Sequence, residues 1–404
     1  MNAHTAPLAQ YAHAPLLMLI TAFLMMQPLS TDLYLASLPS LASGFNVPVS
    51  TVQLTLSLFV IGFGGAQLII GPLSDRYGRR PVLLCGLGLY VAATLVCGLA
   101  PSIEILIAGR FVQALGCCSA VMIARAIVRD AYDPEHSVRV IAKASSWLAL
   151  APIFGPILGS YLQVTFGWRA AFAALGIFSA CVMAVTFFRL PETNAHKNPQ
   201  ATALRGLLAN YRWVLGSREF WRYALPGALS YGSIFSFISG SSFVLIQVLD
   251  VPTAWFGFCF AFGVTGYLIG TIACRRVLFR LGTMRTFYLG TGLSLVAGVI
   301  FLAAVVAGIA HWTLVLVAMF LTMGAHGINF PIAQSGSVSP FPRQAGTAAG
   351  LMGALYMTVA FGVGTIVGAT HNGTLYPLAI IACTLGVLIF CSVRMIPMAP
   401  VAVA

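Results

Sequence analysis

Two ionisable side chains stand inside long apolar stretches of this sequence, where a charge is costly to place. Asp32 lies in the first stretch and Arg110 in the fourth. A charge at the centre of a bilayer costs at least about 2.5–3.5 kcal/mol on insertion scales, so such residues usually have a function. A carboxyl group in a cavity can gain or lose a proton as the cavity opens to either side, whereas a guanidinium stays protonated. We therefore predict that Asp32 binds a proton and that Arg110 is its charge partner, directly or through solvent.

Both residues also have a structural interpretation. Asp32 would have no special role if it lay near the outer end of its helix, wetted by the outside solvent. Arg110 would be structural if it made only hydrogen bonds between helices. Gln113 follows Arg110 by about one helical turn and is expected to face the same side.

Aromatic residues are frequent in the seventh and eighth apolar stretches and are candidates for an apolar ligand cavity. Phenylalanine is also common on surfaces that face lipid, which is the competing interpretation for each. The nine candidates are Tyr231, Phe235, Phe237, Phe243, Trp255, Phe256, Phe258, Phe260 and Phe262.

The composition of the whole chain indicates a membrane protein. Of 404 residues, 59% are hydrophobic and only 7% are charged, whereas a soluble domain carries about 25% charged residues. These proportions exclude a soluble enzyme, a nucleic-acid-binding domain and a disordered chain. A spanning helix needs about 20 apolar residues, and twelve stretches of that kind can be marked. They lie near 13–37, 51–70, 81–100, 103–124, 141–162, 169–189, 222–246, 254–274, 286–308, 312–333, 345–368 and 375–395.

Because only helices and closed barrels satisfy the backbone in lipid, long runs without alternation predict helices. The expected fold is an all-α polytopic membrane protein with 12 transmembrane helices in two six-helix pseudo-repeats. A glycine- and arginine-containing segment begins at Gly71 and again at Gly270, about half the chain apart. We predict an N-terminal six-helix bundle over 1–190, a linker over 191–221 and a C-terminal six-helix bundle over 222–404.

Basic residues lie mainly on one side of the predicted helices. Of the 21 Lys and Arg residues, all but two fall on the side of both termini and the linker; the exceptions are Arg169 and Arg110. The positive-inside rule predicts that this side is cytoplasmic. We expect a multi-pass protein of the bacterial inner membrane with both termini in the cytoplasm.

The segment from Gly71 to Arg80 combines two glycines, one acid and three arginines. The glycines permit close helix approach and a tight turn, and Asp75 can accept charged hydrogen bonds from arginine. The arginines favour the anionic cytoplasmic surface. A basic loop that only sets topology is the alternative. The cluster consists of Gly71, Asp75, Arg76, Gly78, Arg79 and Arg80.

The fifth apolar stretch contains prolines and glycines at close spacing. Pro152 and Pro156 each remove a backbone hydrogen bond, and Gly155 with Gly159 forms a small-xxx-small face. Such a helix is expected to bend and to pack tightly against a neighbour.

Four segments resemble the major facilitator superfamily. The 71–80 segment resembles its loop signature between spans two and three, and 110–116 resembles the R-x-x-Q-A-x-G pattern of proton-coupled members. The 151–159 segment resembles the G-P-x-x-G antiporter motif of drug–proton exporters. Residues 30–35, with Pro39, look like the D-x-Y-L-P segment of the Bcr/CflA branch, which exports bicyclomycin, chloramphenicol and florfenicol.

This resemblance implies a proton-coupled exporter of small amphipathic drugs, phenicol- or bicyclomycin-like, that works by alternating access in exchange for protons. A proton-coupled facilitator of a metabolite such as a sugar, amino acid or nucleoside is the alternative. The family further implies that the 71–80 cluster latches the two halves and that the span-five motif favours antiport. The expected substrate cavity comprises Asp32, Tyr34, Arg110, Gln113, Tyr231 and Phe235.

His326 in the tenth stretch is a further candidate for proton relay, the alternative being a histidine hydrogen-bonded to a neighbouring helix. The sequence contains no phosphate-binding loop, no H-E-x-x-H and no nucleophile elbow, and its nine cysteines lack metal-ligand spacing. We therefore expect no enzyme activity, no cofactor and no metal. The expected partners are protons, small-molecule drugs and the lipid bilayer, but no nucleic acid, and a monomer is expected to suffice.

Overall fold

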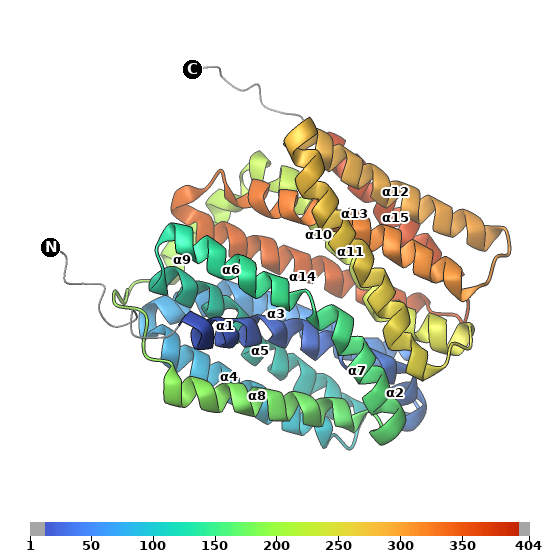
Figure 1. Ribbon diagram of the computed structural model, residues 1–404, viewed down its shortest axis with the longest axis horizontal. Helices are drawn as coiled ribbons and strands as arrows, with labels where there is room; N and C mark the ends of the chain where they lie inside the picture. Colours follow the sequence, from blue (N-terminus) through green and yellow to red (C-terminus); the bar gives the residue numbers. More distant parts are fainter. Residues whose placement is uncertain (1–12, 396–404) are drawn as a thin grey trace.

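The computed structural model describes residues 13–395 of the chain. Within them, twelve helical segments are long and apolar enough to cross a membrane, and no described residue belongs to a strand. The predicted all-α fold with twelve spans is thereby confirmed. The helices run roughly side by side in two groups (Figure 1).

The first six spans include two that are interrupted. Span one consists of α1, η1 and α2, and span five consists of the end of α6 followed by α7. The elements are α1 (His13–Asp32), η1 (Leu35–Ser37), α2 (Leu38–Phe45), α3 (Val49–Tyr77), α4 (Arg79–Gly98), α5 (Ile103–Ala131), α6 (Pro134–Leu148), α7 (Ala151–Phe166) and α8 (Arg169–Arg189).

A short helix of the linker precedes the last six spans. This helix, α9, packs against α10 and α14. The elements are α9 (Leu204–Leu215), α10 (Arg218–Ser242), η2 (Phe243–Val248), α11 (Thr253–Leu281), α12 (Thr283–Val306), α13 (Trp312–Val338), η3 (Pro342–Gln344), α14 (Ala345–Thr370) and α15 (Tyr376–Met395).

Several spans are longer than the sequence indicates. Span one continues to Phe45, span two to Tyr77 and span four to Ala131. These added turns contain polar residues, so hydropathy alone did not assign them to the spans. The arginines of the last turns of α5 therefore belong to a helix rather than to a loop.

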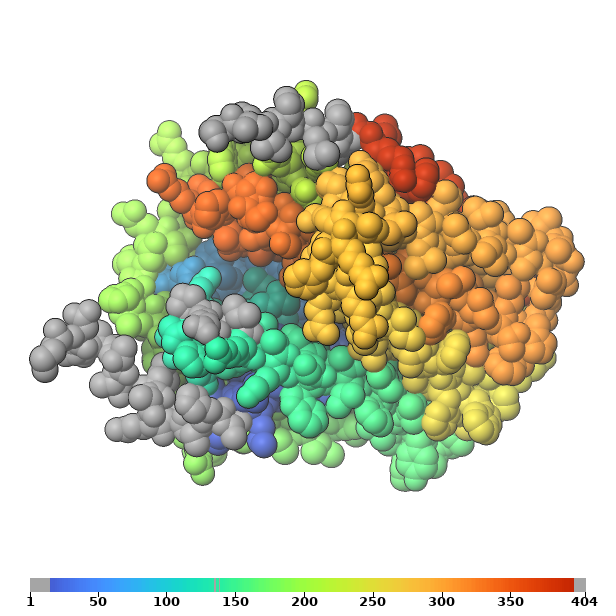
Figure 2. All heavy atoms as spheres, turned by 45° about the horizontal axis from the view of Figure 1, so that its top comes forward, coloured from blue at the N-terminus to red at the C-terminus, as the bar shows by residue number. Residues whose placement is uncertain are grey.

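The two groups of spans pack against each other mainly through two helix pairs, α3–α14 and α7–α11. We call the end of the molecule that carries α9 the linker end, and the other the opposite end. Near the opposite end α7 packs on α11, η1 on α10 and α2 on η2, while α3 packs on α14. Toward the linker end α6 diverges from α11 (Figure 1), and Figure 2 shows a recess between α6 on one side and α11 and α14 on the other.

Candidate functional site

The interruption of span one places Asp32 deep in the molecule. α1 ends at Asp32, and the same span continues through η1 and α2 to Phe45. The Asp32 side chain is only 5% exposed, and it alone is buried among the acids whose side chains the structure describes. Thr31 Oγ1 donates a 2.7 Å hydrogen bond to Asp32 Oδ1. An acid wetted at the outer end of its helix does not fit this position.

Arg110 is fully buried inside the first group of helices and is held by neutral acceptors. Its Nη2 donates to the Ser30 carbonyl at 2.9 Å, its Nη1 to Gln113 Oε1 and its Nε to the Thr55 carbonyl at 3.4 Å. The guanidinium also lies 4.2 Å from the centre of the Phe59 ring. The arrangement ties α5 to α1 and α3, as in the structural interpretation of this residue.

Asp32 and Arg110 form no direct ion pair among the described residues, where the ion pairs of Arg79 and His136 involve other acids. Arg110 contacts α1 through the backbone carbonyl of Ser30, and the Asp32 carboxyl group accepts its hydrogen bond from Thr31. The carboxyl group faces the interior of the protein without a cationic partner in contact.

Three residues expected to line the cavity are enclosed in the first group of helices instead. Tyr34, Arg110 and Gln113 are each fully buried. The Tyr34 hydroxyl shares a 2.9 Å hydrogen bond with Thr55 Oγ1, and Gln113 Nε2 donates to Thr94 Oγ1 at 2.7 Å. In this conformation their polar atoms bond to Thr55, to Thr94 and to one another rather than facing an open cavity, and their place in the substrate cavity stays a prediction.

The span-five motif packs directly against the break in span one. A Cβ at Gly155 would lie 3.6 Å from the Cβ of Asp32, whereas one at Gly159 would overlap the Leu33 backbone. The helix breaks between α6 and α7, just before Pro152. The predicted bend and close packing are both confirmed.

The other face of α7 packs against the second group of helices. Gly257 of α11 lies against the backbone of Pro156 and Ile157 so closely that a Cβ would collide. Its N–H donates a 2.9 Å hydrogen bond to Ser160 Oγ. Thus α7 connects the Asp32 region to α11, and neither Ser160 nor Gly257 was identified from the sequence.

On the second group of helices, Tyr231 begins an aromatic cluster. Tyr231 is half-buried and interacts electrostatically with Asp32 of the first group. Its ring stacks on Tyr356, with centroids 5.9 Å apart, and contacts His326 at 6.0 Å. His326 Nδ1 is 3.0 Å from Ser230 Oγ, as in the alternative of a histidine hydrogen-bonded to a neighbouring helix.

The remaining aromatic candidates divide into buried and exposed positions. Phe235 is 1% exposed, and its ring lies against Gly364 beside Ser57, so it is part of the α10–α14–α3 contact rather than a cavity wall. Three lie on the exposed outer face of α11, at the spacing of one helix stripe. The buried ones are Phe237, Phe243, Phe256 and Phe260, and the exposed ones are Trp255, Phe258 and Phe262.

Arg79 is the centre of the predicted loop cluster. Its Nη1 lies 2.6 Å from Asp75 Oδ1, and its Nε lies 2.8 Å from Asp130 Oδ2. The Arg79 side chain is 6% exposed, compared with 46% for Asp75 and 18% for Asp130. The pair with Asp130 joins α4 to the end of α5 and was not anticipated.

The remaining contacts of the cluster reach the segment after α8. Glu192 accepts hydrogen bonds from the backbone N–H of Arg79 at 2.8 Å and of Arg80 at 3.3 Å. Arg76 donates to Thr202. Gly78, with φ of 109°, makes the tight turn between α3 and α4, as predicted.

Two expectations for this cluster need correction. Gly71 lies inside α3, and no atom outside its own helical neighbourhood is within 4 Å of a Cβ placed there, so it permits no close helix approach. The described polar contacts of Asp75 and Arg79 go to the first group of helices and the linker rather than to α10–α15. In this conformation the cluster does not join the two groups.

The comparisons with known proteins agree with this architecture. A model of the Major Facilitator Superfamily matches residues 18–369. A bicyclomycin resistance protein homolog from Haemophilus influenzae is 26% identical over 354 residues, covering 88% of this chain and 89% of the relative. A chloramphenicol resistance protein from Pseudomonas aeruginosa is 30% identical over 392 residues, covering 94% and 90%.

Solved structures share the fold at lower identity. A D-xylose-proton symporter has a TM-score of 0.71 at 14% identity, covering 93% of this chain and 97% of that one. The human organic anion transporter MFSD10 has a TM-score of 0.70 at 20% identity, covering 96% and 100%. At these identities the likeness concerns the fold alone.

Two packed groups of spanning helices, with a buried acid at a helix break beside their contact, define a membrane transporter. The chain belongs to the major facilitator superfamily. It is a transporter and not an enzyme, and its relatives include proteins named for resistance to bicyclomycin and chloramphenicol.

Proposed function

We propose that this chain exports small amphipathic drugs, phenicol- or bicyclomycin-like, in exchange for protons. The relatives named for drug resistance span most of its length and support this substrate class. The two six-helix bundles, 1–190 and 222–404, rock about their contact, with the linker of 191–221 between them. A single chain suffices for this cycle.

The observation that carries the proposal is the burial of Asp32 against α7. The Asp32 Cβ is within van der Waals reach of a Cβ at Gly155, and the same helix binds α11 through Ser160 and Gly257. A change of charge at Asp32 alters the free-energy cost of keeping this region buried, because an ionised carboxyl group needs water or a partner. Protonation is thus linked to the contact between the two groups of helices.

The cycle follows from that link. In the state open to the linker end, drug enters and displaces a proton from Asp32, and the halves then rock to open outward. The drug leaves, and a periplasmic proton neutralises Asp32. The protein with neutral Asp32 then returns through the closed arrangement to the state open to the linker end. Such a switch needs a ligand that binds the two states with different affinity, and on the return step the proton is that ligand.

The drug is expected to bind between Asp32 and the aromatic cluster of the second half. Tyr231 interacts electrostatically with Asp32, and its partly exposed ring contacts His326 and stacks on Tyr356. An aromatic face next to a titratable acid suits an amphipathic compound, because aromatic rings stack on apolar groups while the acid selects for hydrogen-bond donors.

The linker end is assigned to the cytoplasm of a bacterial cell, with the protein in the inner membrane. The arginines at this end include Arg76, Arg205, Arg276 and Arg394. Excess Lys and Arg in short loops orient a membrane protein with that side inward. The recess between α6 and α11 then receives drug from the cytoplasm.

Drug efflux from energised inverted vesicles tests this function. With the cytoplasmic face outward, wild-type protein should accumulate a labelled phenicol inside the vesicles while the interior is acidic. Collapsing the proton gradient should abolish the accumulation. Gradient-independent accumulation would contradict proton coupling, and proton-driven uptake of a sugar, amino acid or nucleoside without any drug uptake would support the metabolite alternative.

A further inference from the structure

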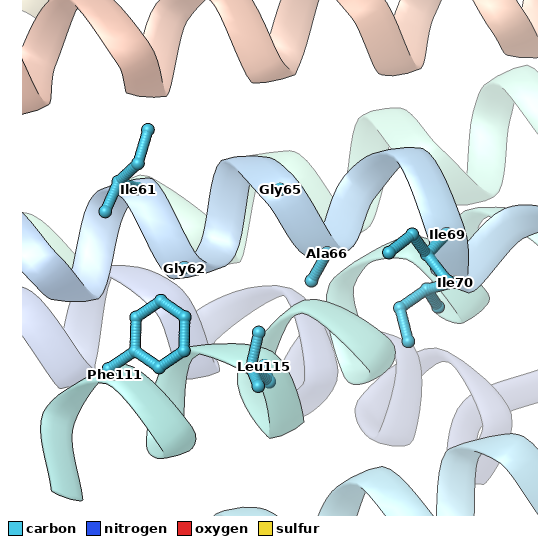
Figure 3. A pocket seen from close by; sticks show the side chains of 8 residues that line it. All are labelled: Ile61, Gly62, Gly65, Ala66, Ile69, Ile70, Phe111 and Leu115. Atoms are coloured by element: carbon cyan, nitrogen blue, oxygen red, sulfur yellow. The ribbon is translucent and has the colours of Figure 1, made fainter. Parts of the chain in front are cut away.

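An apolar groove opens on the outer surface of α3, away from the buried acid. Its volume is about 390 Å³, and it is formed by α3 and α5. Figure 3 shows Phe111 and Leu115 of α5 lying across from the small residues of α3. The lining residues are Ile61, Gly62, Gly65, Ala66, Ile69, Ile70, Phe111 and Leu115.

The groove lies in the part of the membrane nearer the linker end. It covers residues 61–70 of a span that runs from Val49 to Tyr77, which is about 13 Å along a helix that rises 1.5 Å per residue. Ile69 is 58% exposed and Phe111 is 39% exposed. All eight lining residues are apolar, as expected for a surface that faces hydrocarbon.

A cation continues the groove along the same face of α3. Arg76 follows Ile69 by seven residues, and Ile69 follows Gly62 by seven, so the three share one helix face. Arg76 is exposed, donates to Thr202, and lies 5.1 Å from the centre of the Tyr77 ring. Its nearest acid in the sequence, Asp75, pairs with Arg79 instead.

We propose that this groove and Arg76 form a binding site for an anionic phospholipid of the leaflet at the linker end. One acyl chain lies in the groove between α3 and α5, and the phosphate group meets the Arg76 guanidinium. A basic side chain near a membrane surface attracts anionic lipid, and arginine binds phosphate oxygens in a bidentate manner. The half-exposed Tyr77 ring suits the level of the headgroups.

A large side chain at Gly65 should fill the groove without clashing with the protein. No atom outside the neighbouring helix backbone lies within 4 Å of a Cβ at Gly65, so Gly65→Phe should occupy the groove without displacing the protein. A Cβ at Gly88 on α4 would likewise have no such atom within 4 Å. Gly88→Phe is therefore the matched control outside the groove. Arg76→Gln removes the charge, with Arg285→Gln as its control at another exposed position of the linker end.

The experiment measures lipid binding to the purified full-length protein by native mass spectrometry. The probes are phosphatidylglycerol and phosphatidylcholine with the same acyl chains. Wild type and both controls should bind phosphatidylglycerol more tightly than phosphatidylcholine. Gly65→Phe should lose this tight binding, and Arg76→Gln should lose the preference by roughly fivefold, which corresponds to about 1 kcal/mol for one basic residue.

A second arm does not depend on the folding of any variant. Phosphatidylglycerol with a photoreactive group in its acyl chain should label wild-type peptides that contain 61–70 or 111–115. Labelling spread evenly over the exposed spans would overturn the proposal and leave only unselective contact with bulk lipid. Equal binding of the two lipids by wild type, or equal losses in Gly65→Phe and Gly88→Phe, would also overturn it.

Discussion

Arg110 organises the first six-helix group through hydrogen bonds rather than through an ion pair. Its guanidinium donates to the Ser30 and Thr55 carbonyls and to Gln113. Because these acceptors are neutral and the guanidinium stays protonated, no acidic side chain has to change its protonation state together with Arg110. In the proposed cycle, the change of protonation is therefore assigned to Asp32.

Arg110→Ala should destabilise the protein because it leaves the buried carbonyls without donors. The expected loss is about 1.5–3 kcal/mol, the range for hydrogen bonds to charged groups. Thermal unfolding in detergent measures it, with the exposed Arg285→Ala as the control. An unchanged midpoint for Arg110→Ala would show that the hydrogen bonds of Arg110 contribute nothing to stability.

The two acids on Arg79 should differ in what they control. Asp130 forms the more buried pair, so Asp130→Asn should lower the unfolding free energy by about 1.5–3 kcal/mol. Asp75 is half exposed, and Asp75→Asn should cost about 1 kcal/mol or less while slowing turnover. Unfolding curves and transport by reconstituted protein separate these effects. A wild-type transport rate in Asp75→Asn would show that the loop only sets the topology of the protein.

At the scale of elements, α7 joins the helix break of span one to α11. Its two motif glycines have different surroundings, since Gly155 has room for a Cβ and Gly159 lies on the Leu33 backbone. The spacing of these glycines predicts the close packing. It does not reveal which glycine touches backbone, because that depends on the register of α7 against span one.

Gly155→Ala should be tolerated, whereas Gly159→Ala should sharply reduce folded protein in the membrane. An added Cβ at Gly155 makes an ordinary contact, but one at Gly159 must push α7 away from the Leu33 backbone. Fluorescence-detected size-exclusion of both variants provides the measurement. Similar yields of the two would contradict the packing described for α7.

Sequence patterns were sufficient for features that depend on local chemistry. The twelve spans follow from apolar length, and the turn at Gly78 and the break before Pro152 follow from backbone restrictions of these residues. Long-range partners were missed, since nothing near Arg79 in the sequence indicates Asp130 or Glu192. The sequence also could not tell whether Asp32 and Arg110 meet directly or through solvent, because residue types alone do not tell which face of α1 meets α5.

At the scale of the whole molecule, the two groups of helices meet near the opposite end and along α3–α14, with a recess toward the linker end (Figure 2). This arrangement has a definite orientation if the linker is cytoplasmic. In the proposed cycle, drug enters through the recess from the cytoplasm. Asp32, the proposed proton site, lies deeper in the molecule, at the break in span one.

Membrane-impermeant maleimide applied to intact cells tests the orientation. A cysteine at Thr165, in the last turn of α7, should react from outside, and one at Gln200 in the linker should react only after the membrane is opened. One span, α8, separates the two sites, so they must lie on different sides. Labelling of both from outside would contradict the twelve-span topology.

The central claim is that the exchanged proton resides on Asp32. Its most direct test is proton release from detergent-solubilised protein when a transported drug is added in weakly buffered solution. Wild type should acidify the medium, because drug displaces the proton, and Asp32→Asn should give no more than the drug-free control. The amide keeps the size of the side chain, so drug binding itself is expected to persist. Undiminished release from Asp32→Asn would contradict the account and make His326 the next residue to test.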